Sequence, residues 1–158
     1  MWKKVMRWMA VVCWLMLIFV FSSQNAKNST YQSKNFISKV IVGSIRIAEK
    51  VGVANEENKP TKTQIKIWVN RFHKPVRKLA HATLYFILAI ILLLAFNAKR
   101  NTSPKYVIIV LAICIIYAMI DEFHQIFVPG RAGMFVDCFI DTLGAAIACM
   151  IYRAFSRK

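Results

Sequence analysis

Acidic residues are scarce in this sequence, with only 7 Asp and Glu against 22 Lys and Arg in 158 residues. Charged residues of both signs make up 18% of the chain, while 58% of the residues are hydrophobic. This composition, with its apolar residues clustered, excludes an ordinary water-soluble domain and predicts a single membrane domain over residues 1–158. The net charge of +15 means that any partner attracted over a distance should be anionic.

The sequence also lacks the motifs of several enzyme and cofactor classes. It contains no HExxH zinc motif, no GxSxG nucleophile motif and no glycine-rich phosphate loop. No two of its cysteines have the CxxC spacing of zinc or redox sites, and all of them fall within apolar runs. We therefore expect them to pack as small apolar side chains, and we predict no cofactor. These residues are Cys13, Cys114, Cys138 and Cys149.

Four apolar stretches are long enough to be transmembrane helices. A bilayer core about 30 Å thick requires roughly 20 helical residues. We predict spans at residues 5–21, 79–96, 106–127 and 135–152. The third span includes the polar segment DEFHQ, because the apolar stretch before it is only 15 residues long and too short to cross a bilayer alone. The predicted fold class is an all-α integral membrane bundle of four transmembrane helices with an amphipathic helical loop outside the cytoplasm.

Proline and glycine residues mark the expected helix ends. Pro75 precedes the second span and Pro104 precedes the third, where proline is common in the first turn of a helix. Pro129 and Gly130 should end the third helix and begin the turn into the fourth. Gly144, with the alanines near it, should let a neighbouring helix approach the fourth span closely.

The first span has the layout of a secretory signal peptide as well as that of a transmembrane helix. Lys3, Lys4 and Arg7 flank an apolar core, as basic residues do in signal peptides. Cleavage would place Phe21 or Gln24 where a small residue is required, so we expect the helix to be retained.

Basic residues gather at both chain ends and between the second and third spans. They are Lys3, Lys4, Arg7, Lys99, Arg100, Lys105, Arg153, Arg157 and Lys158. The short loop between the third and fourth spans contains only one basic residue, Arg131. By the positive-inside rule, both termini should be cytoplasmic, and residues 22–78 should lie outside the cell membrane.

The long segment between the first two spans contains a basic amphipathic pattern. Apolar residues recur at helical spacing between Phe36 and Val51, with Lys and Arg among them. A second apolar stripe runs from Ile65 to Phe72, after a polar linker. Such helices either bind an anionic membrane surface or cap the bundle, and the sequence leaves both open.

Ionisable residues within the spans should meet at one end of the bundle. An Asp at the centre of a transmembrane helix costs roughly 2.5–3.5 kcal/mol, yet four of the seven acidic residues lie in predicted spans. Antiparallel spans place the ends of spans one and three, and the starts of spans two and four, at the same membrane face. That face collects Ser22, Ser23, Gln24, Arg77, Lys78, His81, Tyr85, Asp121, Glu122, His124, Gln125, Arg131, Asp137 and Asp141.

The segments that carry these polar residues resemble a known family. FSSQ, RKLAHATLY, DEFHQIFVPGR and DCFIDTLGA occur in this order in the VanZ-like family of small bacterial multi-pass membrane proteins. The resemblance covers nearly the full chain and implies a cell-envelope protein, and the family's namesake is linked to resistance to teicoplanin-type glycopeptide antibiotics. Many members have Glu before the tyrosine of the second segment, where this chain has Leu84.

The polar cluster has three interpretations. In the first, it binds an anionic envelope ligand, such as a membrane lipid, a lipid-linked wall precursor or a glycopeptide, which fits the resistance that the resemblance suggests. Arginine suits such a ligand because its planar guanidinium makes bidentate contacts with phosphate or carboxylate. The ligand-binding residues would be Arg77, Lys78, His81, Tyr85, Gln125, Arg131 and Asp137.

In the second interpretation, the chain is a membrane-embedded enzyme that acts on a lipid head group. Candidate catalytic residues are Asp121, Glu122, His124 and Asp141. A divalent metal, for which spacing alone is weak evidence, would be held by His81, His124, Asp121 and Asp141.

In the third interpretation, the cluster is purely structural, with Arg77 and Arg131 pairing with the acids to hold the helices in register. No nucleic-acid partner is expected under any of the three, because the basic residues flank membrane spans and form no recognition helix.

Overall fold

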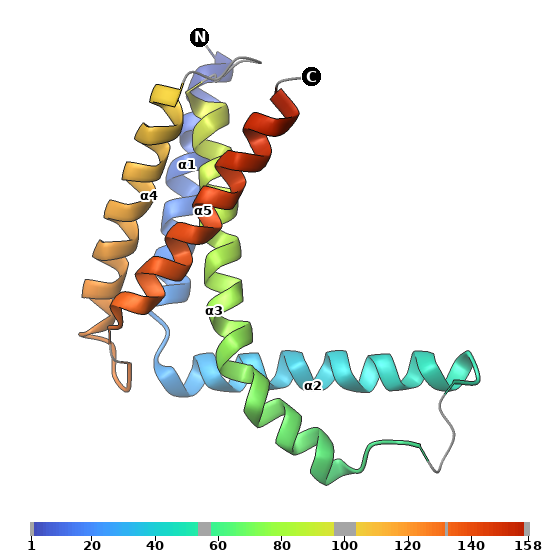
Figure 1. Ribbon diagram of the computed structural model, residues 1–158. Coiled ribbons are helices and arrows are strands. Elements are labelled where there is room, and N and C mark those ends of the chain that lie inside the picture. The colour runs from blue at the N-terminus through green and yellow to red at the C-terminus, as the bar shows by residue number, and fades with distance from the viewer. Residues whose placement is uncertain (1, 54–57, 97–103, 132, 157–158) are drawn as a thin grey trace. The chain divides into compact units, whose positions relative to one another are not determined.

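Five helices and no strand make up the part of the chain that the computed structural model describes, residues 2–53, 58–96, 104–131 and 133–156. The helices are α1 (Trp2–Ser22), α2 (Ala26–Lys50), α3 (Lys62–Ala95), α4 (Pro104–Gln125) and α5 (Phe135–Ser156), shown in Figure 1. The predicted all-α fold class is confirmed.

Four of these helices, α1, α3, α4 and α5, are long and apolar enough to cross a bilayer. Large apolar side chains are exposed on their outer surfaces, for example Met16 on α1, Ile116 on α4 and Phe139 on α5. Hydrocarbon solvates such a surface far better than water does. The structure therefore supports the four predicted spans, although α4 ends at Gln125 rather than at residue 127.

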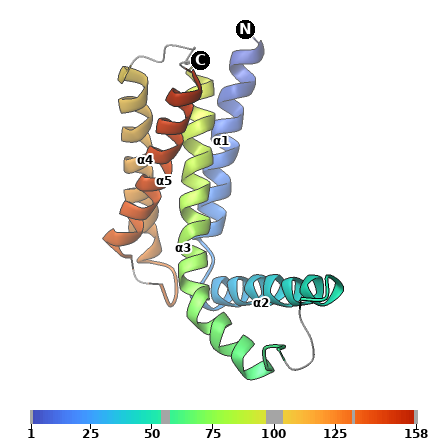
Figure 2. The ribbon, with the colours of Figure 1, turned by 45° about the vertical axis from the view of Figure 1, so that its right-hand side comes forward.

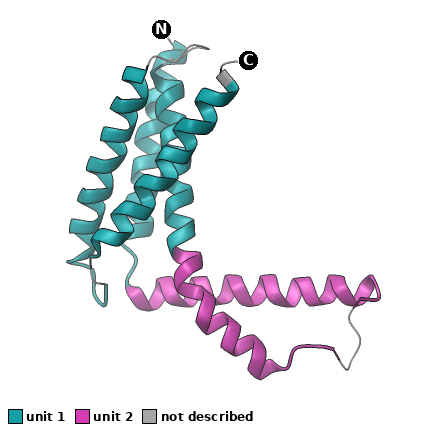
Figure 3. Cartoon of the chain, viewed as in Figure 1, with its two compact units in different colours: residues 1–25, 78–158 teal, residues 26–77 magenta. Residues whose placement is uncertain are grey.

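The chain divides into two compact units (Figure 3). The first unit comprises residues 1–25 and 78–158, which include α1, the second part of α3, α4 and α5. The second comprises residues 26–77, which include α2 and the first part of α3.

In the first unit, α1, the second part of α3, α4 and α5 form a helical bundle (Figures 1 and 2). The beginning of α1 and the end of α5 lie at the same end of this bundle. The Trp14 indole N–H donates to the carbonyl oxygen of Leu84 at 2.9 Å, which links α1 to α3. The Tyr117 hydroxyl donates to the carbonyl oxygen of Leu15 at 2.7 Å, which links α4 to α1. Interhelical hydrogen bonds of this kind help to hold transmembrane bundles together.

Small side chains line much of the bundle core. Buried core residues on α4 and α5 include Cys114, Ala118, Ala145, Ala148 and Cys149. Small residues let helix backbones approach closely, which increases van der Waals packing where lipid provides no hydrophobic driving force. The expectation that cysteines pack as small apolar residues is therefore confirmed for Cys114 and Cys149.

The other two cysteines are less enclosed than predicted. Cys138 is half-buried at the edge of the core, and Cys13 is exposed on the surface of α1. A cysteine on the outer surface of a membrane helix still has an apolar solvent, so its position in an apolar run of the sequence does not require burial in protein.

Gly144 marks the close approach of α5 to α3. A Cβ atom at this position would clash with the carbonyl oxygen of Ala82 and lie 2.9 Å from its carbonyl carbon. These are backbone atoms, which cannot rotate away as a flexible side chain could. The predicted role of Gly144 in close helix packing is confirmed.

The start of α3 differs from the prediction. Pro75 does not begin a helix but lies inside the 34-residue α3. The helix begins after Thr61, whose hydroxyl accepts a hydrogen bond from the Gln64 N–H at 3.3 Å, while the Gln64 side chain accepts one from the Thr61 N–H at 2.8 Å. This reciprocal pair is a capping box. Pro75 removes only one backbone hydrogen bond, to the carbonyl of the exposed Arg71.

In the second unit, α2 is longer than the amphipathic pattern that predicted it. The helix begins at Ala26 instead of near Phe36. Near its end, Glu49 forms an ion pair at 2.5 Å with Lys59, which lies beyond the helix. Residues 54–57 of the predicted polar linker lie outside the described residues.

We expect Gly144→Ala to lower the free energy of unfolding by about 1–3 kcal/mol, because the added methyl group overpacks the contact with Ala82. Unfolding of the full-length protein by SDS in mixed micelles measures this loss. The matched control is Gly43→Ala in α2, where a Cβ atom meets nothing within 4 Å and alanine favours the helix. Equal stability of the two variants would show that α5 does not need this close approach.

Candidate functional site: the polar end of the bundle

Polar side chains gather at the end of the bundle opposite the chain termini. Here α1 and α4 end, and α5 and the second part of α3 begin (Figure 1). We call this region the polar end. Its residues are Ser22, Ser23, Lys78, His81, Tyr85, Asp121, Glu122, His124, Gln125, Arg131, Asp137 and Asp141.

At the centre of the polar end, three helices each contribute one side chain to a compact triplet. One nitrogen or carboxylate oxygen from each of His81, Asp121 and Asp141 lies within 4.8 Å of the others. The two aspartates are only 3% exposed, and His81 is partly buried. These residues lie 40 and 20 positions apart in the sequence, so only the antiparallel packing of α3, α4 and α5 brings them together.

Asp121 is held by a hydrogen-bond network that reaches α1. The Gln125 amide nitrogen donates to Oδ2 of Asp121 at 3.3 Å and to the Ser22 hydroxyl at 3.0 Å. Gln125 and Asp121 are one helical turn apart, so both side chains lie on the same face of α4. All three side chains are buried. The network therefore fixes one carboxylate oxygen of Asp121 in place.

Two buried polar atoms beside this network make no hydrogen bond with any described part of the chain, namely Oδ1 of Asp121 and the Tyr85 hydroxyl. Tyr85 is fully buried and interacts electrostatically with both Asp121 and Asp141. Buried polar groups in proteins are nearly always hydrogen-bonded.

His124 is not part of the triplet and contacts residues at the end of α1. Its Nε2 atom lies 3.2 Å from the Ser23 hydroxyl, and its ring packs on Phe19 with 4.7 Å between the ring centroids. The four residues proposed from the sequence as metal ligands are therefore separated: His81, Asp121 and Asp141 come together, and His124 contacts the end of α1 instead. Asp121 and His124 are three residues apart, a spacing that places them near one face of α4, so the packing of the helices and not their spacing separates the two side chains.

The cationic residues at the polar end lie beside its acids. Lys78 forms an ion pair with Asp137, and both side chains are partly buried. Arg131 interacts electrostatically with Asp121 and Glu122. Arg77 belongs to the second unit, so its predicted role beside these residues stays a prediction.

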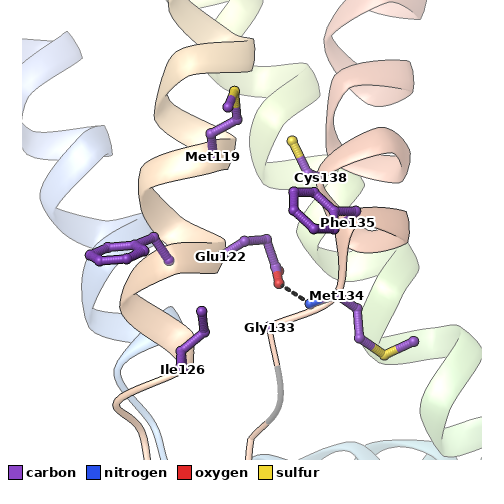
Figure 4. A pocket seen from close by; sticks show the side chains of 8 residues that line it. Met119, Glu122, Ile126, Gly133, Met134, Phe135 and Cys138 are labelled. Atoms are coloured by element: carbon purple, nitrogen blue, oxygen red, sulfur yellow. Dashed lines mark hydrogen bonds between the residues drawn. The ribbon is translucent and has the colours of Figure 1, made fainter.

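Glu122 lines a separate pocket between α4 and α5, shown in Figure 4. This cavity of about 230 Å³ has mostly apolar walls, and its lining includes Met119, Phe123 and Phe135. Oε2 of Glu122 accepts a hydrogen bond from the Met134 N–H at 2.7 Å, just before α5 begins. Phe123 and Phe135 are largely exposed, so the pocket opens on the apolar outer surface of the bundle.

Two local features of the chain shape this pocket. Gly130 has a φ of 76°, a left-handed conformation that glycine adopts without strain in the turn after α4. Gly133 lies so close to α4 that a Cβ atom would meet the carbonyl oxygen of Glu122 at 2.7 Å. The turn can therefore return the chain tightly against α4.

The second unit has a basic groove of its own. Lys34 on α2 and Lys62 and Lys66 on α3 contribute to its lining. Exposed apolar side chains such as Phe36 and Ile47 occur on the same α2 helix. This unit therefore combines cationic and apolar surface, as the predicted amphipathic pattern requires.

Sequence reasoning placed Ser22 and Ser23 at the polar end but did not select them as binding residues. The structure connects Ser22 to Gln125 and Ser23 to His124. It also reveals the apolar pocket beside Glu122, whose walls carry no sequence signal because they look like ordinary lipid-facing residues.

Comparison with protein families gives this arrangement its context. A family model described as VanZ/LLP1 matches residues 7–156, nearly the whole chain. The chain belongs to the VanZ/LLP1 family. With its four apolar helices, this VanZ/LLP1 protein is a multi-pass membrane protein of VanZ type. A comparison with curated proteins finds no match, and neither does one with solved structures.

The contribution of the hydrogen bond between Glu122 and the Met134 N–H to the stability of this VanZ/LLP1 protein can be tested by mutation. Glu122→Ala should lower the free energy of unfolding by about 1–3 kcal/mol, because it leaves the Met134 N–H without its acceptor. Glu122→Gln keeps an acceptor oxygen and should lose much less. SDS unfolding in mixed micelles compares the two, and equal losses would show that the charge of Glu122, and not this hydrogen bond, matters for stability.

Proposed function

We propose that the polar end of this VanZ/LLP1 protein binds the anionic head group of an envelope lipid or lipid-linked wall precursor, and that this binding contributes to tolerance of teicoplanin-type glycopeptides. The main observation behind the proposal is that, among the described residues of the bundle, eight acidic, basic and histidine side chains lie at one end. They are Lys78, His81, Asp121, Glu122, His124, Arg131, Asp137 and Asp141. Ionisable residues inside membrane spans are expensive and usually functional.

Lys78 and Arg131 are the donors that suit such a head group. Lys78 keeps part of its side chain accessible while paired with Asp137. Arg131 lies in the turn between α4 and α5, and its guanidinium matches phosphate geometry. Both residues belong to the first unit and lie at its polar end.

The pocket beside Glu122 supports a lipid as the ligand. It has apolar walls, opens on the lipid-facing surface and lies between α4 and α5 at the same end of the bundle. An acyl or prenyl chain would fit such walls, while its head group reaches the charged residues. A soluble glycopeptide would gain little from this apolar opening.

Catalysis at the triplet is the second candidate function. The observation that favours it is the convergence of His81, Asp121 and Asp141. An imidazole beside two carboxylates is a common arrangement for general acid–base chemistry or for metal-assisted reaction of a bound head group. A purely structural role would instead use the Gln125, Ser22 and Asp121 network to hold the helices in register.

We further propose that the chain termini lie in the cytoplasm of the host cell and that residues 22–78 lie outside. The support is the basic end of the bundle, where Lys3, Lys4 and Arg7 line one pocket together with Trp8 and Tyr106. Basic residues next to membrane spans favour the cytoplasmic side, and Trp and Tyr favour the interface.

Neutralising the cationic donors should separate binding from folding. In a glycopeptide-susceptible bacterial host, we expect Lys78→Gln and Arg131→Gln to remove the increase in teicoplanin tolerance that the wild-type chain confers, with unchanged membrane abundance. In nanodiscs, native mass spectrometry should show fewer phosphatidylglycerol adducts on both variants. Lys105→Gln is the matched control, since it removes the same charge at the start of α4, at the opposite end of the bundle.

Retained tolerance and retained lipid adducts in both variants would contradict the binding proposal. Loss of tolerance in parallel with loss of folded protein would favour the structural role instead. Equal losses in Lys105→Gln would show that overall charge, and not the polar end, is responsible.

The proposed orientation can be tested with reporter fusions to the C-terminus. A fluorescent protein that folds only in the cytoplasm should be bright there, and alkaline phosphatase, which is active only outside, should be inactive. The opposite pair of results would place the chain termini outside and the polar end at the cytoplasmic surface.

A further inference from the structure

The polar end carries more acidic than cationic side chains. Among the described residues of the first unit that lie at this end, four are acidic (Asp121, Glu122, Asp137 and Asp141) and two are permanent cations (Lys78 and Arg131). Lys78 pairs with Asp137, on the first turn of α5. An anionic head group would add further negative charge to this region. Its binding would be easier to explain if the protein also held a cation there.

The triplet has the donor atoms and the spacing for such a cation. One imidazole nitrogen and two carboxylate oxygens lie within 4.8 Å of one another. Ligand atoms at about 2.0–2.2 Å from a zinc-like ion lie roughly 3–4 Å apart, so closure requires only small side-chain movements. The three ligands come from three different helices, which fixes the site by the packing of the bundle.

Unsatisfied buried polar atoms point to the same place independently. Oδ1 of Asp121 makes no hydrogen bond to the described residues, and its residue is only 3% exposed. The hydroxyl of fully buried Tyr85 likewise makes none within the described ranges, and it interacts electrostatically with both aspartates of the triplet. A metal ion would take the free oxygen of Asp121, and a water or ligand atom on that ion would accept from Tyr85.

We propose that His81, Asp121 and Asp141 bind one divalent transition-series cation, such as Zn²⁺ or Mn²⁺. A mixed nitrogen and oxygen donor set suits these ions better than Mg²⁺ or Ca²⁺, which prefer oxygen alone. Three protein ligands leave at least one coordination position open. We also assign that open position to a phosphate oxygen of the lipid head group, a step that rests on the function proposed above.

Metal binding can be measured on the full-length protein in phosphatidylcholine nanodiscs, stripped with chelator and titrated with Zn²⁺. We expect one tightly bound ion per chain. His81→Gln and Asp121→Asn should weaken Zn²⁺ binding by roughly 100-fold. Removing a residue that only hydrogen-bonds a metal ligand can already cost about this much affinity. His124→Gln is the matched control, because this histidine contacts Ser23 and is not part of the triplet; it should bind Zn²⁺ like the wild type.

A second measurement does not depend on the variants folding. Mn²⁺ bound to the wild-type protein should show pulsed-EPR coupling to one imidazole nitrogen. The site is overturned if the wild type binds no Zn²⁺, if its Mn²⁺ shows no nitrogen coupling, or if well-folded His81→Gln binds Zn²⁺ as tightly as His124→Gln.

Repeating the measurement of phosphatidylglycerol binding with and without Zn²⁺ separates this inference from the proposed function. Stronger lipid binding with metal in the wild type, but not in Asp121→Asn, supports the open coordination position. If lipid binding is the same with and without Zn²⁺, the lipid phosphate does not occupy the open coordination position, and the proposed function stays intact. Metal binding without any lipid binding overturns the proposed function and leaves the metal site intact. Adding inorganic phosphate as a competitor shows whether the phosphate group alone is recognised.

Discussion

Hydrocarbon cannot solvate a carboxylate, and the polar end of this bundle is arranged around that constraint. Asp121 and Asp141 lie on membrane-length helices and are buried by protein. Each must therefore find polar neighbours on other helices or at a membrane surface. The hydrogen bonds of Gln125 and the convergence with His81 meet this need at one end of the bundle.

Close helix packing is what makes the convergence possible. Gly144 lets α5 contact the backbone of α3 at Ala82. Ala82 follows His81 directly on α3, and Gly144 lies three residues after Asp141 on α5. The small side chains of α4 and α5 extend this packing through the core. The same compact backbone arrangement then brings one polar side chain from each of three helices within a few ångströms, where wider helix spacing would separate them.

The two ends of the bundle differ in chemistry, and the difference suits a protein that acts at one face of a membrane. Lysine, arginine and aromatic side chains line a pocket at the end with the chain termini. The opposite end combines acids, histidines and cations with an apolar pocket that opens toward lipid. Membership in the VanZ/LLP1 family is consistent with a membrane role for this asymmetric bundle, and the acidic excess at the polar end makes a bound cation relevant to any anionic ligand.

Hydropathy and the positions of proline and glycine in the sequence were enough to determine four spans and the start of α4 at Pro104. They also determined that polar residues gather at one end, because a bilayer imposes length and antiparallel order on any such chain. They misplaced the start of α3, since the helix continues through Pro75 and the capping box at Thr61 was not recognised. Only the tertiary structure decided that His81 joins Asp121 and Asp141 while His124 packs on Phe19. The rotation of each helix about its own axis makes that choice, and it depends on side-chain packing between helices, which spacing along one helix does not specify.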